Sequence, residues 1–256
     1  MTLKGKIIVF ILLSLIGVFL ITQTTYENKQ KEKSLKILMD KQAMEEAKLK
    51  AEMEELSKKA AEEKKIADAE KKKIEEEKRL REEKKAVLDA KYTKAKDLFY
   101  NGKNYIGTIN LAEEIIKEDS LNYEAYSLKG IALCYLSSSS GNANKYEEGM
   151  VAIEKSLSVK ADYAQARFNK ALALELFGHY TESLQWYRKA LEIEDDLWSY
   201  YGIASIYGRK GDVKNAIENL KIAIEKNPTV REIAAHEEDF NNIKNSKEFK
   251  DLISNK

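Results

Sequence analysis

Few side chains in this sequence could act as nucleophiles, general bases or metal ligands. The 256 residues include two histidines, His179 and His236, and one cysteine, Cys134. Nucleophilic and metal sites need several such groups at set spacings, and no G-x-x-x-x-G-K-[ST], G-x-S-x-G or H-E-x-x-H motif occurs. The 43 Asp and Glu residues are too many for any pair to indicate acid-base work. We therefore expect no enzyme, no metal and no cofactor.

Cys134 has two interpretations. It lies between Leu133 and Leu136 in an apolar helical pattern, which is typical of a small buried hydrophobe. The alternative is a reactive thiol, which requires access to solvent. A single cysteine excludes an intramolecular disulfide and leaves the redox compartment open.

The net charge is close to zero in both the middle and the C-terminal part of the chain. Residues 27–90 hold 19 Lys or Arg against 18 Asp or Glu, and residues 91–256 hold 23 against 25. Neither segment has a basic excess, so we expect no nucleic-acid partner. All aromatic residues except Phe10, Phe19 and Tyr26 lie at or beyond Tyr92, so a substantial core is expected only there.

Residues 1–26 predict a membrane anchor. Lys4 and Lys6 precede fifteen uncharged, mostly apolar residues, and residues 7–23 approach the lower length limit of a spanning helix. The length also fits a cleaved secretory signal, but the following ITQTTYENKQ lacks the small-x-small pattern that signal peptidase reads. We expect a retained single-pass anchor in a cell membrane.

The orientation of this anchor is balanced between two signals. A short basic tail usually stays cytoplasmic, which would place the remainder of the chain outside the cytoplasm. Lys29, Lys31, Lys33 and Lys36 on the other flank favour the opposite arrangement. We expect the C-terminal domain to be extracytoplasmic. The richness in Lys, Ile and Asn is typical of an AT-rich bacterial genome.

Residues 27–90 predict a charged helical rod. The segment has no Gly or Pro and many acid-to-base pairs at i,i+4, such as Glu54 with Lys58 and Glu55 with Lys59. A heptad seam over residues 35–74 is apolar only in part, with Leu49, Met53 and Leu56 as its best stretch. A weak coiled coil that forms a homo-oligomer and a solvated single helix both fit this pattern.

A period of 33 residues appears near the C-terminal end. Residues 163–196 and 197–229 each contain two amphipathic segments joined by a glycine turn, with small residues where helices would meet. The matched pairs are Gly178 with Gly211, Tyr180 with Val213, Ser183 with Ala216, Tyr187 with Leu220, Ala190 with Ala223, and Leu191 with Ile224. Residues 90–121 and 122–161 follow the pattern more loosely.

This pattern resembles the tetratricopeptide repeat family. The resemblance implies an all-α, right-handed α-solenoid of about four helix hairpins over residues 91–256. We expect Pro228 to end the last repeat and residues 230–256 to form a capping helix, with apolar positions at Ile233, Phe240, Ile243, Phe249, Leu252 and Ile253. The second repeat carries about seven extra residues in SSSSGNANKY, which we expect to form an enlarged, mobile, exposed turn.

The family resemblance also implies a binding groove along the first helix of each repeat. The strongest lining candidates are Tyr100, Tyr135, Phe168, Leu172, Trp198, Tyr201 and Arg209. Further candidates are Asp97, Asn101, Glu124, Ser127, Ile131, Gln165, Glu175 and Ser205. Aromatic residues are favoured as interface anchors, although the same rings could instead pack against adjacent repeats. Thr93, Asp97, Ser127 and Leu128 occupy the positions where some family members grip a carboxylate, so chaperone-tail binding is disfavoured.

These features together predict a membrane-anchored, non-enzymatic adaptor or scaffold. An unidentified protein or peptide would bind in the groove, and residues 27–90 would act as a spacer. The alternative is a structural envelope spacer that self-associates through the charged helix.

Overall fold

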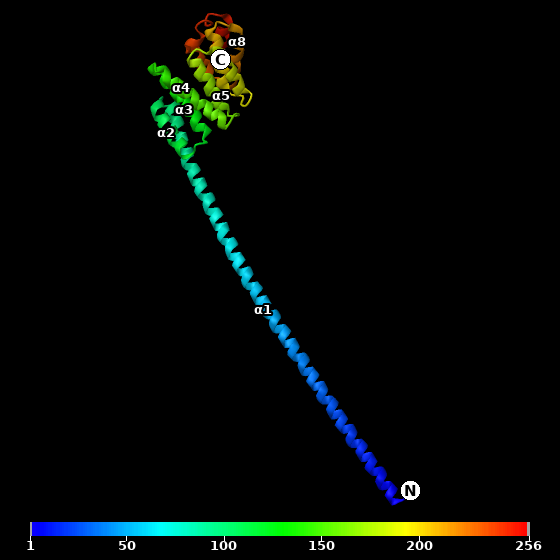
Figure 1. Ribbon diagram of the computed structural model, residues 1–256. Helices are drawn as coiled ribbons and strands as arrows, with labels where there is room; N and C mark the ends of the chain where they lie inside the picture. The colour runs from blue at the N-terminus through cyan, green and yellow to red at the C-terminus, as the bar shows by residue number, and fades with distance from the viewer. Residues whose placement is uncertain (1, 255–256) are drawn as a thin grey trace. The chain divides into compact units, whose positions relative to one another are not determined.

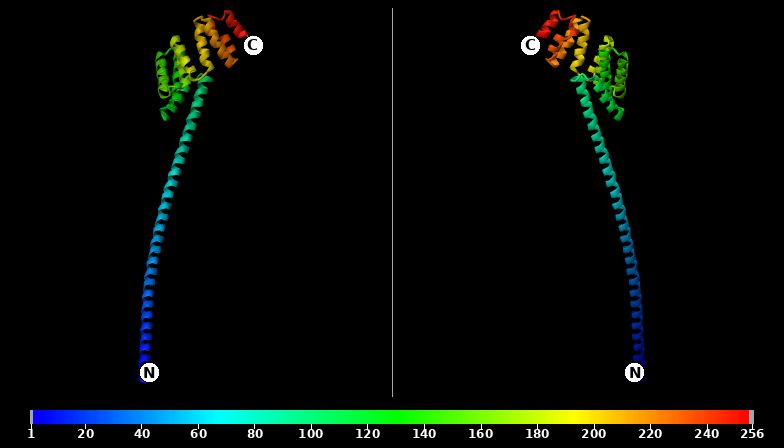
Figure 2. Two further views of the ribbon diagram at one scale, coloured as in Figure 1. Left: turned by 90° about the vertical axis from the view of Figure 1, so that its right-hand side faces the viewer. Right: turned by 90° about the vertical axis from the view of Figure 1, so that its left-hand side faces the viewer.

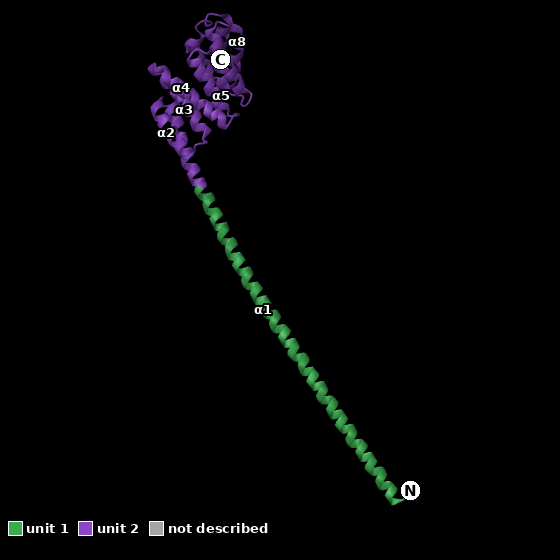
Figure 3. Ribbon diagram, viewed as in Figure 1, with its two compact units in different colours: residues 1–80 green, residues 81–256 purple. Residues whose placement is uncertain are grey.

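The computed structural model describes residues 2–254. These form two compact units with a boundary between Leu80 and Arg81 (Figure 3). The described residues form helices and no strands, as the sequence predicts. The elements, labelled where space allows in Figure 1, are α1 Leu3–Tyr100, α2 Tyr105–Glu118, α3 Tyr123–Ser140, α4 Ala143–Val159, α5 Ala164–Leu176, α6 Tyr180–Leu191, α7 Leu197–Arg209, α8 Val213–Lys226, α9 Val230–His236, the 3-10 helix η1 Glu238–Phe240, and α10 Lys247–Ser254.

The first unit is a single stretch of helix α1. Its helical hydrogen bonding continues from Leu3 without interruption, because no proline occurs here and the charged residues are strong helix formers. The predicted ion pairs Glu54 with Lys58 and Glu55 with Lys59 both form, at 2.8 Å. No residue between 2 and 80 is buried, so this unit has no core of its own.

The apolar part of this unit meets the length and composition of a membrane-spanning helix. Its large side chains between Ile7 and Ile21 are 45–72% exposed, and none of them is covered by protein. Exposed apolar surface of this extent is costly in water and favourable in hydrocarbon.

The second unit is a stack of antiparallel helix hairpins. The end of α1 packs against α2 through Leu88 and Ala95. Helix α3 pairs with α4, α5 with α6, and α7 with α8, and the hairpins follow one another in chain order (Figure 2). This is the predicted α-solenoid. The first hairpin begins earlier than the expected residue 90, because Leu88 is buried against Ala112 and Ile115 of α2.

Small side chains allow the two helices of each hairpin to approach closely, as predicted. The repeat position occupied by Thr108, Gly149, Ser183 and Ala216 is buried in all four hairpins. The Ser183 hydroxyl donates a hydrogen bond to the Ala171 carbonyl at 2.7 Å. This bond replaces the hydrogen bond to water that the hydroxyl loses when it is buried.

The serine-rich insertion is helical, so the expectation of an enlarged turn is wrong, although residues 138–144 are exposed as expected. Helix α3 continues through the serines to Ser140, α4 already begins at Ala143, and only Gly141 and Asn142 lie between them. Gly141 adopts φ 72°, a left-handed conformation that ends α3 without a steric penalty. The buried Ser137 hydroxyl donates to the Asn142 carbonyl at 2.7 Å. The extra residues therefore lengthen both helices of the second hairpin.

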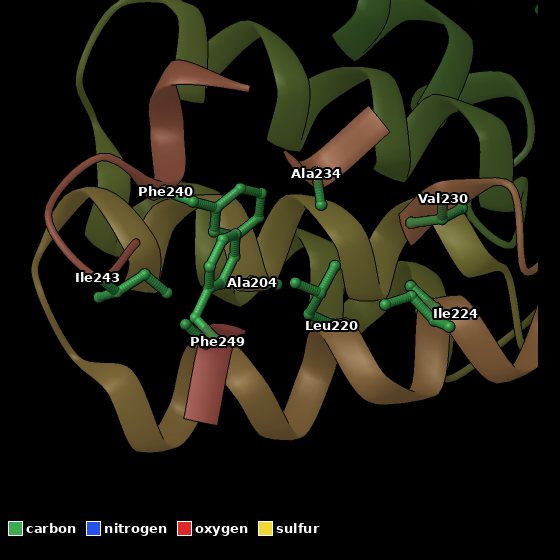
Figure 4. Close-up of a cluster of buried hydrophobic side chains, with 10 residues drawn as sticks. Ala204, Leu220, Ile224, Val230, Ala234, Phe240, Ile243 and Phe249 are labelled. Carbon is green, nitrogen blue, oxygen red and sulfur yellow. The ribbon is translucent and has the colours of Figure 1, made fainter. Parts of the chain in front are cut away.

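The cap consists of three short pieces, α9, η1 and α10, where a single covering helix was expected. Helix α8 ends at Lys226, two residues before Pro228, as predicted. Phe240 and Phe249 stack at 5.5 Å between ring centroids and close the apolar face of α7 and α8 (Figure 4). Ile243 is also buried, and Leu252 and Ile253 pack against this cluster. Ile233 is 41% exposed, so its assignment to the covering face is wrong.

Candidate functional site

Two adjoining cavities run along the first helices of the repeats. The first encloses about 520 Å³ between the ends of α1, α3, α5 and α7, and the second encloses about 460 Å³ between α3, α5, α7 and the cap. They share the side chains of Tyr135, Phe168, Leu172 and Trp198. We call the two cavities together the groove.

All seven of the strongest sequence candidates line this groove. Tyr100 lines the first cavity, Tyr201 and Arg209 line the second, and the remaining four belong to both. Helical geometry explains this, because residues three or four apart lie on one face of a helix and the first helices of successive repeats stand side by side. That these side chains bind a partner stays a prediction.

The aromatic residues of the groove fall into two groups. Tyr135 is half-buried and packs against Phe99 at 5.4 Å and Tyr105 at 5.3 Å, so part of its surface serves the fold. Tyr100 and Trp198 are 55% and 43% exposed, which leaves much of each ring available. Trp198 also makes a T-shaped contact with Tyr201 at 5.8 Å, which orients it. Tyr100 and Trp198 are therefore the aromatic residues of the groove with the most exposed surface.

A chain of polar groups links α5, α6, α7 and the cap beneath the second cavity. Glu175 accepts hydrogen bonds from the Tyr187 hydroxyl at 2.6 Å and from the Ser205 hydroxyl at 2.8 Å. Ser205 also lies within hydrogen-bonding distance of Asp239, which forms an ion pair with Arg209. Because Ser205 has one proton, it can donate to only one of the two carboxylates at a time. Burial raises the pKa of Glu175 above its usual value.

Five of the eight wider candidates line neither cavity, namely Asp97, Asn101, Glu124, Ser127 and Ile131. Ser127 and Ile131 are 1% and 0% exposed, because α3 is covered by α5 as well as by α2 and α4. The amide of Asn169 on α5 donates to the Ser127 hydroxyl at 2.9 Å, so Ser127 joins two hairpins. Asp97 and Asn101 bond to each other at 2.7 Å and line neither cavity.

Sequence reasoning missed eight groove residues that lie outside the expected first helices, among them Lys103, Tyr180, Tyr187 and Asp196 in the turns and second helices. Tyr105 begins α2, while Ile233, Glu237 and Asp239 come from the cap. The period of 33 residues predicts equivalent positions within repeats and contains no information on the irregular cap. The acidic run Glu237 to Asp239 was the one available signal, and the abundance of carboxylates elsewhere hides it.

The remaining chemically capable side chains are dispersed. His179 stands before α6 and His236 ends α9, and both are exposed. Among residues 2–254, no group of three or more His, Cys, Asp or Glu side chains could hold a metal ion. Cys134 is fully buried, and burial raises its pKa to about 12, so its interpretation as a small buried hydrophobe is confirmed.

Comparison with known proteins supports the repeat assignment. Residues 141–197 and 199–229 match models of the tetratricopeptide repeat. The structure of TTC0263, a thermophilic tetratricopeptide repeat protein of Thermus thermophilus, is similar with a TM-score of 0.53 at 17% identity, covering 58% of this chain and 79% of that one. PilW, described as a widely conserved type IV pilus biogenesis factor, is similar with a TM-score of 0.47 at 18% identity, covering 66% of this chain and 79% of that one. No curated protein matches the sequence significantly. The predicted tetratricopeptide repeats are confirmed over residues 141–229, and the likeness to solved structures extends to the fold alone.

Proposed function

We propose that this tetratricopeptide repeat chain is a membrane-anchored, non-enzymatic adaptor or scaffold that binds an extended or helical segment of a partner protein in the groove. Proteins with these repeats generally mediate protein-protein interactions, and the groove gives that role a location in this chain. The observation that carries the proposal is the continuity of the two cavities, with Tyr100 and Trp198 exposed on their walls. Partly exposed aromatic rings beside a cavity contribute strongly to the binding free energy when a partner covers them.

The anchor would confine the repeats near a membrane. Residues 7–23 present a continuous apolar surface that no part of the protein covers. A single helix of this length is sufficient to span the hydrocarbon core when its flanking residues reach the interface. Residues 27–80 would then separate the repeats from the anchor, with the repeats on the extracytoplasmic side of a bacterial cell membrane.

The groove proposal is tested by affinity capture with matched variants of the full chain. Trp198→Ala removes an exposed anchor and Leu121→Ala removes an equally apolar side chain that is 65% exposed and lines neither cavity. We expect Trp198→Ala to lose partners that the wild-type chain and Leu121→Ala both retain. Capture of the same partners in equal amounts by all three proteins would refute the groove assignment.

A second candidate function is self-association through the first unit, as a structural spacer. Leu49, Met53 and Leu56 follow the i, i+4, i+7 spacing of one helix face and are 60%, 64% and 65% exposed. Pairing of two such faces would bury them in a short coiled coil. Sedimentation velocity of the full chain in detergent micelles distinguishes the two functions. A dimer that Met53→Glu converts to a monomer supports the spacer, and a monomer at all concentrations refutes it.

A further inference from the structure

The first unit has an uneven arrangement of charge just after its apolar segment. Within residues 2–80, Lys29 and Lys33 are the one pair of basic residues four positions apart, and we call them the lysine pair. Side chains at this spacing share one face of a helix, and like charges there repel each other. Lys36 adds a third cation, and the nearby acid Glu32 lies four positions before Lys36, in the order that favours their pairing. The lysine pair is therefore not neutralised within the helix.

Elsewhere in this unit the basic residues have acidic neighbours. Every basic residue between positions 41 and 80 has an acid three or four positions away, and Glu54 with Lys58 is an example, an ion pair of 2.8 Å. In the part of the chain that the structure describes, neither member of the lysine pair forms an ion pair, and both side chains are exposed. The lysine pair is thus available to an anion from outside the chain.

The proposed anchoring brings the lysine pair close to the lipid headgroups. Lys29 lies six residues after Gln23, which is about 9 Å along the helix, and Lys33 lies about 15 Å along it. The headgroup layer extends about 5 to 8 Å beyond the hydrocarbon core, and the negative potential of anionic lipids reaches about 8 Å further at physiological ionic strength. A lysine stem can also bend back toward the bilayer. Both ammonium groups are therefore within range of the lipid phosphates.

Tyr26 is a second feature of the membrane interface on the same helix face. It lies three positions before Lys29 and seven before Lys33, so the three side chains are on one side of the helix. Its side chain is 66% exposed. Tyrosine is enriched at the level of the headgroups, because its ring is apolar and its hydroxyl is polar. The face that carries the lysine pair thus combines an interfacial ring with two cations.

We propose that the lysine pair binds the phosphate of an anionic phospholipid in the headgroup layer beside residues 26–33. This inference rests on the proposed anchoring of residues 7–23. An anionic lipid such as phosphatidylglycerol has a phosphate with no cation in its own headgroup, whereas the choline of phosphatidylcholine compensates its phosphate. A phosphate between the two ammonium groups replaces their repulsion with two charge-assisted hydrogen bonds. The flexible stem of lysine allows both groups to reach one phosphate.

Two measurements on the full chain test the anchoring and the lipid site separately. Flotation with vesicles of phosphatidylcholine alone tests the anchoring, because it requires only the apolar segment. Native mass spectrometry of the chain released from detergent micelles compares its affinities for phosphatidylglycerol and phosphatidylcholine. We expect wild type to float with these vesicles and to bind phosphatidylglycerol more tightly than phosphatidylcholine by on the order of tenfold.

A double variant tests the lysine pair itself. Lys29→Gln with Lys33→Gln removes both charges and keeps residues of good helix propensity. Each lysine at an anionic lipid surface contributes about fivefold to binding, and Lys33 lies farther out, so the affinity for phosphatidylglycerol should fall by on the order of tenfold. The affinity for phosphatidylcholine should not change. Lys58→Gln with Lys72→Gln removes the same charge far from the apolar segment, and this matched control should bind both lipids like wild type.

The outcomes separate this inference from the function on which it rests. Flotation together with equal affinities for the two lipids, or an equal loss in the double variant and the control, would overturn the lipid site and leave the anchoring standing. An unchanged affinity for phosphatidylglycerol in the double variant, as expected if the lysine pair serves an acidic protein instead, would also overturn it. A wild-type chain that does not float with phosphatidylcholine vesicles would overturn the anchoring, and the lipid site with it.

Discussion

Helices α3 and α4 approach closely at Gly130 and Gly149, and substituting one of these glycines tests how the lengthened second hairpin is paired. A Cβ atom on Gly130 would lie 2.6 Å from the Gly149 carbonyl oxygen and 2.5 Å from Cγ1 of Ile153. The carbonyl belongs to the backbone of α4, so it cannot rotate away as a flexible side chain would. Overpacking of this kind costs about 1 to 3 kcal/mol. Alanine also gains about 1 kcal/mol of helix propensity over glycine, so Gly130→Ala should lower the free energy of unfolding by up to about 2 kcal/mol.

Urea unfolding followed by tryptophan fluorescence is the appropriate assay. Both tryptophans, Trp186 and Trp198, lie in the second unit, so the signal is independent of the long helix in residues 3–80. Ser158→Ala, at an exposed position of α4, is the control for helix propensity and should stabilise by a few tenths of a kcal/mol. If Gly130→Ala stabilised the protein as much as Ser158→Ala does, α3 and α4 would not pair in this register and the hairpin assignment would be wrong.

Three further predictions concern the first turn, the buried carboxyl group and the membrane. Lys103 has φ 46°, a left-handed conformation that costs a non-glycine residue about 1 to 2 kcal/mol. Glycine avoids this cost, but its larger unfolded-state entropy offsets about 0.5 to 1 kcal/mol of the gain, so Lys103→Gly should stabilise the protein by about 0.5 to 1 kcal/mol in urea unfolding. A loss of stability would contradict the turn geometry. Burial raises the pKa of the Glu175 carboxyl group above 4.5, so the folded state keeps the carboxyl proton to higher pH than the unfolded state does. The stability that this protonation contributes is lost as pH rises through the folded-state pKa. The free energy of unfolding of Glu175→Gln minus that of wild type should therefore increase with pH above about 4.5, and a difference independent of pH would show that Glu175 is not buried as described. Cys134 is buried and so shielded from the reagent, and a single engineered Ser57→Cys should therefore react in intact cells with a membrane-impermeant maleimide. Labelling only after lysis would place the repeats in the cytoplasm.

Regular repeats made much of this fold predictable from the sequence. Gly178 and Gly211, 33 residues apart, both adopt the left-handed φ that ends a first helix, at 79° and 74°. The small residues at the start of each second helix are buried as expected, because only a small side chain fits where two backbones meet. The same alignment placed all seven of the strongest groove candidates beside one of the two cavities.

Features that depend on tertiary contacts were not predictable in this way. The serines of the second repeat form helix because Gly141 terminates α3 after them and Ser137 is buried against the start of α4, neither of which low complexity reveals. Ser127 and Ile131 were expected on an open face, but α5 covers that face of α3. The cap brings Asp239 to Ser205 through an irregular path that no repeat period describes.

Site-specific photocrosslinking in living cells tests the central claim most directly, namely that a partner protein occupies the groove. A photoreactive benzoylphenylalanine replaces Trp198 in one variant and Leu121, outside the groove, in the other. We predict a discrete adduct from position 198 that is absent from position 121 and is reduced by a second substitution, Phe168→Ala. Equal adducts from both positions, or none from position 198, would contradict the account.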